Sequence, residues 1–261
     1  AARNYAPRVL GLFAADDIFN DVPEEVLIAR GLVDPSIPAD AKGTNLILYG
    51  NRPGTLGFNP PTAAEMGELT MTILQRMGRE ARAPFLLVAE VESTDNFGNN
   101  NNAIGTLTAL KHANDLIAEA QEFQQTQVRR TLILTAADSD GGGMQVGFVT
   151  PGQNVGSYNN NPTGVSAQNV NSPLDGRYGR GTAPFLAEPD AYGRQMPFAV
   201  SWVGTPDISG GIVSRAQGQN AEEFDRVFSG RFDNTDVYRM MYLTLFGRGL
   251  PDAVGQTAPS R

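Results

Sequence analysis

The sequence predicts an α/β fold in three layers, with a mainly parallel sheet flanked by helices. Two short apolar runs support this prediction, Phe85–Ala89 and Thr131–Ala137. Each run is too short for a membrane span and is typical of a strand that is buried on both faces. A helical pattern over Ile104–Phe123 lies between the runs. Strand, helix and strand in this order indicate a right-handed crossover between parallel neighbours.

Further elements are indicated by helix-start signals and by shorter apolar runs. The clearest signal is a capping box, in which Thr62 and Glu65 satisfy each other's backbone N–H groups. It opens a helix that is expected to end near Gly78. The other expected elements are a helix from Asp233 to Leu245 and short strands at Arg8–Ala14, Asn45–Tyr49, Pro197–Val203 and Gly211–Ala216.

The composition limits the classes of function. The chain has 261 residues and a net charge of −8, with 41% hydrophobic residues. This length suits one large α/β domain or two small ones. The negative charge argues against a nucleic-acid partner, and no apolar run reaches the ~18 residues that predict a membrane span. Residues 141–196 are rich in glycine, asparagine, proline and serine, so we expect an irregular insertion there.

The ligand types are also limited. The chain has no cysteine and a single histidine, His112. Neither a thiolate site nor a His-rich zinc site can therefore be built from this chain alone. We expect His112 to be an ordinary residue of a helix, and no catalytic or cofactor-binding residue is assigned.

Carboxylates follow both apolar runs. Glu90 and Asp95 come after the first run, and Asp138 comes after the second. Ligands bind beyond the carboxyl ends of strands in open sheets, and neighbouring strands are about 5 Å apart, so we expect these three side chains to converge. Close carboxylates need a cation, a basic side chain or raised pKa values. Solvated loop acids are the alternative interpretation.

Other polar and aromatic residues have two interpretations each. Asn99–Asn102 forms either a ligand loop or, as we favour, a turn that caps the helix beginning near Ala103. Trp202 and Phe198 are expected to pack in a strand rather than to form a stacking platform. Arg177 and Arg180 stand among glycines, where a solvated loop is favoured over an anion contact.

Short motifs occur in a fixed order over nearly the whole chain. They are Leu10–Ala14, Pro61–Met66, Leu87–Asp95, Arg130–Asp138, Ala216–Gly218, Phe228–Gly230 and Asp233–Met240. In this order they resemble the alkaline phosphatase family, whose corresponding motifs read L-x-G-L-F-A, P-T-L-A-E-M, V-E-G-x-x-I-D, T-L-V-I-V-T-A-D-H, A-Y-G, F-x-G and D-N-T-D-I-Y-R-x-M. The resemblance implies an alkaline-phosphatase-like three-layer αβα sandwich, of which residues 1–261 form the C-terminal portion.

The resemblance also implies a metal site. Glu90 falls where the family binds magnesium, and Asp95 and Asp138 fall where it binds zinc. The three positions expected to hold zinc histidines are occupied by other residues, namely Asn99, Ser139 and, in a looser alignment, Asp207. Oxygen ligands suit magnesium or calcium better than zinc.

The serine nucleophile of the family and its phosphate-binding arginine belong to an N-terminal half that lies outside this chain. The resemblance thus implies a partner, either that half or a second chain, which completes the sheet beside Val9–Phe13. A homo-oligomer stays an open alternative, and the resemblance implies a periplasmic or extracellular location.

Two functions remain. The favoured one is a degenerate, non-catalytic member of the family that acts in binding or assembly. The alternative is a metal-dependent phosphoric monoester hydrolase that is completed by the N-terminal half. Missing histidines favour the first, because the family uses zinc to activate its nucleophile and to stabilise the leaving oxygen. Whether the chain is an enzyme is therefore left open.

Overall fold

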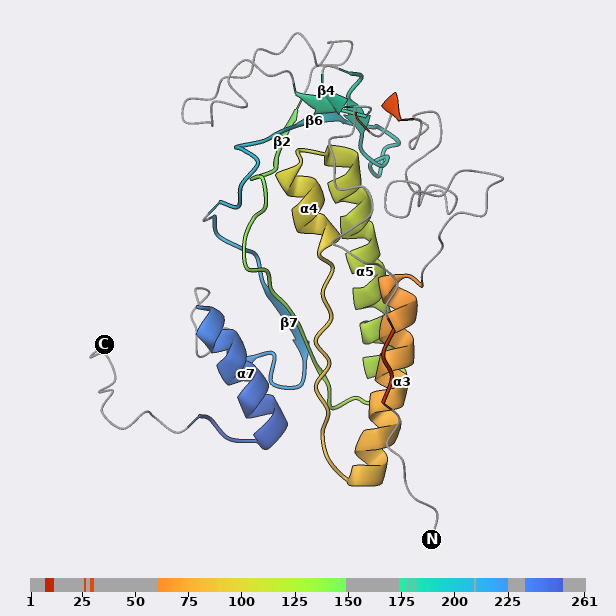
Figure 1. Ribbon diagram of the computed structural model, residues 1–261, viewed down its shortest axis with the longest axis vertical. Coiled ribbons are helices and arrows are strands. Elements are labelled where there is room, and N and C mark those ends of the chain that lie inside the picture. The colour runs from red at the N-terminus through yellow and green to blue at the C-terminus, as the bar shows by residue number, and fades with distance from the viewer. Residues whose placement is uncertain are drawn as a thin grey trace, which may run out of the picture. The chain divides into compact units, whose positions relative to one another are not determined.

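The computed structural model describes residues 8–11, 26, 29–30, 61–148, 174–177, 179–180, 182–208, 210–224 and 233–250 (Figure 1). The described part is mixed α/β and divides into two compact units. The first unit comprises Ala1–Met66, Ala89–Ile117 and Ser139–Gly211, and the second comprises Gly67–Val88, Ala118–Asp138 and Ile212–Arg261. The strand expected at Asn45–Tyr49 lies outside the described residues.

Two long helices confirm the sequence prediction. Helix α3 spans Ala63–Ala81 and opens on the expected capping box. The Thr62 N–H donates to Glu65 Oε2 at 2.8 Å, and the Glu65 N–H donates to Thr62 Oγ1 at 3.1 Å. Helix α5 spans Ala103–Thr126. The side chain of Asn102 accepts a hydrogen bond from the Gly105 N–H at 2.8 Å, which confirms the expected cap at the start of this helix.

The last helix, α7, spans Asn234–Phe246 and has defined signals at both ends. Asp233 accepts from the Thr235 N–H at 2.9 Å, and the Asp236 carboxylate accepts from the Asp233 N–H at 3.0 Å. Gly247 ends the helix in a left-handed conformation with φ of 66°, which glycine adopts without a Cβ clash.

The prediction that the two apolar runs form a parallel pair of buried strands is wrong. Phe85–Ala89 is extended but belongs to no strand. In the second run, strand β1, Leu132–Thr135, pairs antiparallel with β7, Arg215–Gly218. An apolar run favours an extended conformation but does not specify the neighbouring strand, and β1 pairs with a segment much later in the sequence. The α/β class is confirmed, whereas every ladder between the described strands is antiparallel.

A second sheet lies in the first unit, and its central strand is β6, Pro197–Ser201. This strand confirms the prediction at Pro197–Val203. The strand expected at Gly211–Ala216 is found in part as β7, Arg215–Gly218, which pairs with β1 and not with β6. The described part of the expected insertion contributes four short strands, β2 (Gln145–Phe148), β3 (Asp175–Gly176), β4 (Gly179–Arg180) and β5 (Phe185–Leu186).

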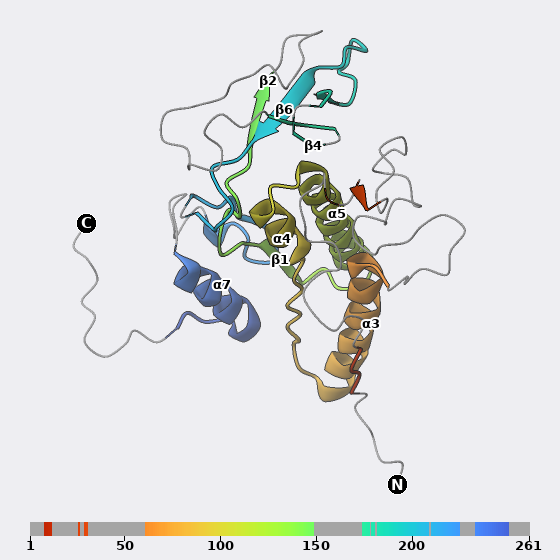
Figure 2. The ribbon, with the colours of Figure 1, turned by 45° about the horizontal axis from the view of Figure 1, so that its top comes forward.

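The core of the first unit forms between this sheet and the start of α5. Ala103, Phe185, Val200 and Trp202 are buried together, and the rings of Phe185 and Phe198 stack with centroids 5.1 Å apart. This confirms the expected packing role of Trp202 and Phe198. Figures 1 and 2 both show helix α4, Ser93–Asn99, beside the N-terminal half of α5.

Within the turn between β5 and β6, the Asp190 carboxylate accepts three hydrogen bonds beside those of the backbone. Asp190 Oδ1 accepts from the backbone N–H groups of Tyr192 at 2.8 Å and Arg194 at 2.9 Å, and Oδ2 accepts from Arg194 Nε at 2.8 Å. Hydrogen bonds from the backbone and side chain of Arg194, followed by that from Tyr192, lower the pKa of Asp190 below its ordinary value of 3.8.

A prediction for the first capping box concerns Thr62. Thr62→Ala removes the acceptor for the Glu65 N–H, so the free energy of unfolding is expected to fall by about 1 kcal/mol. Thr62→Ser keeps the hydroxyl and is expected to stay within a few tenths of a kcal/mol. Chemical denaturation of the three proteins measures both effects, and equal destabilisation by alanine and serine would contradict the capping role.

A second prediction concerns acid. Because the folded-state pKa of Asp190 is lowered, its ionised form stabilises the turn above pH 3.8, and this contribution is lost as the pH falls through the folded-state value. Asp190→Asn removes the titrating group and is expected to abolish this step. The exchange rate of the Arg194 amide, followed by NMR between neutral and acid pH, reports the difference between the two proteins.

Candidate functional site

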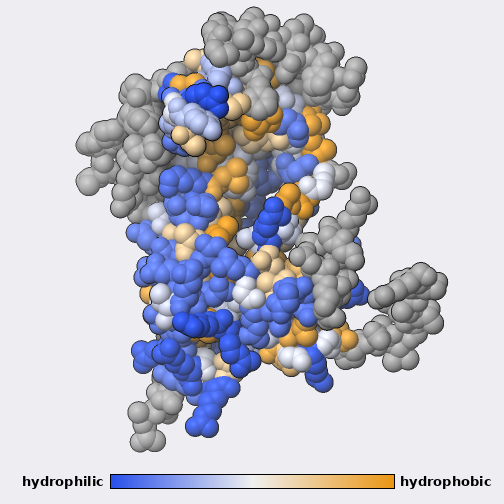
Figure 3. Space-filling model, turned by 180° about the vertical axis from the view of Figure 1, so that it is seen from behind, coloured by the Kyte–Doolittle hydropathy of each residue, from blue (hydrophilic) through white to orange (hydrophobic). Residues whose placement is uncertain are grey.

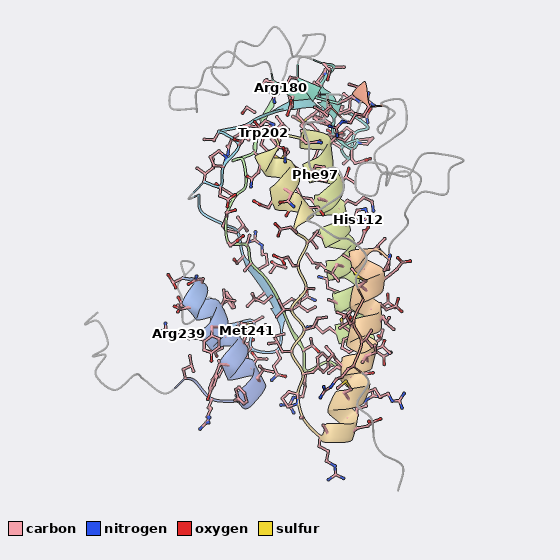
Figure 4. The ribbon with its side chains drawn as sticks, viewed as in Figure 1. Phe97, His112, Arg180, Trp202, Arg239 and Met241 are labelled. Atoms are coloured by element: carbon pink, nitrogen blue, oxygen red, sulfur yellow. The ribbon has the colours of Figure 1, made fainter. Side chains whose placement is uncertain are left out.

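Helix α4 carries two of the residues singled out in the sequence. Asp95 and Asn99 stand four positions apart and so lie on one face of the helix. Asn99 Nδ2 donates to Asp95 Oδ2 at 3.0 Å. Phe97 is fully buried and anchors the helix (Figure 4). A Cβ at Gly105 would collide with the Phe97 ring, so this glycine allows α4 to approach α5.

The same amide nitrogen also reaches a residue far along the chain. Asn99 Nδ2 donates to Asp207 Oδ1 at 2.8 Å across a separation of 108 residues. Ser139 Oγ lies 3.4 Å from Asp95 Oδ1, at a long hydrogen-bond distance. We call Asp95, Asn99, Ser139 and Asp207 the polar cluster. It joins Asp95 to all three residues that stand at the positions expected to hold histidines.

Glycines bring the segments of the polar cluster together. The carbonyl oxygen of Gly142 accepts from the Gly204 N–H at 3.2 Å. Asn101 Nδ2 donates to the carbonyl oxygens of Gly98 at 3.2 Å and of Gly204 at 2.6 Å. A Cβ at Gly142 would collide with the Gly98 oxygen and would stand 2.7 Å from the Gly204 oxygen. Only a residue without a side chain fits at this position.

Two buried oxygens lie in these segments without hydrogen-bond donors. They are Asn99 Oδ1 and Asp140 Oδ1, and neither accepts a hydrogen bond from the described residues. Leaving a buried acceptor unpaired costs about 1–3 kcal/mol. Asp140 and Asp207 also form no ion pair with residues in the described ranges. The described residues therefore leave two buried acceptor oxygens in these segments without a donor, and they leave the Asp140 and Asp207 carboxylates without a cationic side chain.

The side-chain arrangement does not fit a metal ion held between Asp95 and Asp207. Asn99 directs its nitrogen at both carboxylates, and an amide N–H donates hydrogen bonds but does not ligate metals. Turning this amide over would present its oxygen instead. Within the described part of the chain, no three His, Cys, Asp or Glu side chains group closely enough to hold a metal ion.

The two other expected metal residues do not join the polar cluster through hydrogen bonds. Glu90 and Asp138 are exposed, and neither side chain bonds to a residue that the structure describes. Glu90 belongs to the first unit and Asp138 to the second. Their role as metal ligands stays a prediction.

Histidine 112 is half-buried on α5. Burial lowers its pKa from the ordinary value, while the nearby Asp115 carboxylate raises it and Lys111 lowers it further. The imidazole is thus neutral at pH 7. This fits the ordinary role expected for His112 in a helix.

Sequence reasoning named each member of the polar cluster but missed the helix that holds two of them. The segment after Glu92 contains Asn96, Gly98 and Asn99, which are poor helix formers. The i, i+4 spacing of Asp95 and Asn99 was the available signal, since such pairs share a helix face.

Comparisons with known protein families, with curated proteins and with solved structures find no match. Among the residues whose structure is described, no helix has the length and apolar character needed to cross a membrane.

A third prediction tests the glycine contact. Gly142→Ala puts a Cβ against two rigid carbonyl oxygens, so the free energy of unfolding is expected to fall by about 1–3 kcal/mol. Gly147→Ala is the matched control, because a Cβ at Gly147 meets no atom within 4 Å. Denaturation curves compare the two variants, and equal stability would show that the backbone segments do not meet at Gly142.

Proposed function

We propose that this chain is a degenerate, non-catalytic relative of the alkaline phosphatases that acts in binding or assembly. The proposal is supported by the residues that surround Asp95. Where the resemblance leads us to expect histidines, the chain has an amide, a hydroxyl and a carboxylate. Asn99 and Ser139 both reach Asp95, and Asn99 also bonds to Asp207.

The observation that carries the proposal is the bridge made by Asn99. A zinc-binding histidine offers a nitrogen lone pair to a cation, whereas the Asn99 nitrogen offers N–H groups to two carboxylates. Hydrogen bonds to charged groups contribute about 1.5–3 kcal/mol each. The bridge therefore links Asp95 to Asp207 by donating hydrogen bonds, which is a structural role.

The alternative is a metal-dependent phosphoric monoester hydrolase whose nucleophile comes from another part of the protein. The free acceptors at Asn99 Oδ1 and Asp140 Oδ1 favour it. With the Asn99 amide turned over, the oxygens of Asp95, Asn99 and Asp207 would form the kind of ligand set that magnesium or calcium prefers. Glu90 and Asp138 as further metal ligands belong to this alternative.

A fourth prediction separates the two functions. The double substitution Asn99→His and Asp207→His gives Asp95 two histidine neighbours. The two imidazoles and the Asp95 carboxylate then make three ligands, and three protein ligands suffice to hold zinc. We expect this variant to retain zinc after dialysis and the native chain to retain none in stoichiometric amount. Asn100→His is the matched control, because the Asn100 side chain donates to the Asn96 carbonyl oxygen and not to a carboxylate.

The complete protein, including the N-terminal half that the alternative requires, is also expected not to hydrolyse p-nitrophenyl phosphate when zinc, magnesium or calcium is added. Hydrolysis by the complete protein that is lost in Asp95→Asn would overturn the proposal and establish the alternative. Stoichiometric zinc in the native chain would overturn the assignment of Asn99 as a hydrogen-bond bridge.

A further inference from the structure

Strand β7 has no large apolar side chain. It reads Arg-Ala-Gln-Gly, and all its residues except Ala216 are exposed. Alanine and glycine are depleted in strands. Among the described strands β7 pairs only with β1, and an isolated pair of strands is marginally stable in water. Hydrophobic residues gather in small groups on the face that Figure 3 shows, but β7 has none to add. Its own apolar side chains therefore do not hold it beside β1.

A chain of glutamine amides joins β7 to helix α5. Gln121 Nε2 donates to Gln217 Oε1 at 2.7 Å, and Gln217 Nε2 donates to Gln124 Oε1 at 3.1 Å. Gln124 Nε2 donates in turn to the Thr131 carbonyl oxygen at 2.8 Å. We call these three glutamines the amide relay. It ties β7 to α5 and to the residue before β1, across a sequence separation of 93 residues between Gln124 and Gln217.

The direction of the amide relay is set by its last acceptor. A carbonyl oxygen accepts hydrogen bonds but cannot donate them, so Gln124 directs its nitrogen at Thr131 and its oxygen toward Gln217. That oxygen needs a donor, which orients the Gln217 amide, and the Gln217 oxygen orients Gln121 in the same way. Turning any of these amides over would bring two donors or two acceptors together.

The Thr131 carbonyl oxygen is shared between β7 and α5. It accepts from the Gln219 N–H, directly after β7, at 2.9 Å as well as from Gln124. Gly218 lies against both groups with φ of 96°, and a Cβ there would collide with Gln124 Nε2 and with the Thr131 oxygen. Glycine adopts this conformation without a Cβ. Gln124 is only 8% exposed, so its bonds at this junction are shielded from water.

We propose that β7 is a detachable strap and that Gln124 is the latch that holds it on β1. The ladder extends over only four residue pairs, and closing the long chain segment between the two strands costs entropy. Loss of the Gln124 amide therefore releases β7 while the helices of the second unit stay folded. Local openings of this kind lie at the low-stability end of a native structure. Release bares the backbone groups of β1 that pair with β7.

The device belongs to the second unit, which contains β1, β7 and all three glutamines. The polar cluster contributes no residue to it. The proposal therefore goes beyond the proposed function and does not depend on it.

Hydrogen exchange of the Gln219 amide measures the release, because this N–H is freed from Thr131 when β7 detaches. Gln124→Met keeps the length of the buried side chain but removes its amide. At a pH where exchange follows the opening equilibrium, Q124M is expected to speed exchange of the Gln219 amide about tenfold through the lost hydrogen bonds. The Leu74 amide, in the middle of α3, is expected to keep its native rate.

Gln125→Met is the matched control. Gln125 is the next residue of α5, is exposed, and forms no hydrogen bond with the residues that the structure describes. It undergoes the same chemical change on the same helix, so Q125M is expected to leave the exchange of the Gln219 amide unchanged.

A double-mutant cycle tests the amide relay itself. Gln217→Ala removes the donor to Gln124 and is expected to speed exchange of the Gln219 amide less than Q124M does, since the bond from Gln124 to Thr131 remains. In Q124M/Q217A the increase is expected to be smaller than the product of the two single effects, because both substitutions remove the bond between Gln124 and Gln217. In Q125M/Q217A it is expected to equal that of Q217A alone.

The latch is contradicted by any one of three outcomes. They are equal effects of Q124M and Q125M, a rise in Leu74 exchange that matches the rise at Gln219, and single effects of Q124M and Q217A that simply multiply. The measurements need neither metal nor phosphate ester, so their failure and a failure of the proposed function are read separately.

Discussion

The polar cluster depends on a close approach of three backbone segments that only glycine at position 142 permits. The end of α4 at Gly98, the turn at Gly142 and the loop at Gly204 meet without side chains between them, and Asn101 ties two of their carbonyl oxygens together. The positions of Asp95 and Asp207 are therefore set largely by the backbone. Such a frame tolerates changes in the side chains that it presents, so an amide and a carboxylate can occupy positions where histidines are expected.

Local signals predicted the parts of the fold that depend on neighbours in sequence. The capping box at Thr62 and the cap at Asp233 each satisfy orphan backbone donors within a few residues, so the starts of α3 and α7 follow from the sequence alone. Asn102 caps α5 in the same way. These interactions need no information about the rest of the chain, which explains why α3, α5 and α7 were predicted correctly, whereas α4, which has no side-chain cap, was missed.

Pairing of strands depends on partners far away in sequence. The apolar run at Phe85–Ala89 predicted an extended segment, but its composition carries no information about which strand lies beside it. β1 pairs with β7 in a register that joins Leu132 to Gly218, and no pattern within either strand specifies this choice. The candidate site has the same limit. The spacing of Asp95 and Asn99 indicates a shared helix face, whereas the contact with Asp207 appears only in three dimensions.

The orientation of one amide decides which chemistry the polar cluster favours. With Nδ2 toward Asp95 and Asp207, Asn99 offsets part of their charge by donating hydrogen bonds. A divalent ion between these carboxylates requires the amide to turn over and to lose both bonds. If each bond contributes about 1.5 kcal/mol, this cost weakens ion binding by about a hundredfold. A histidine at position 99 would present a lone pair to the ion and would lose no such bonds. An asparagine at this position therefore competes with a metal ion, whereas a histidine there would ligate it.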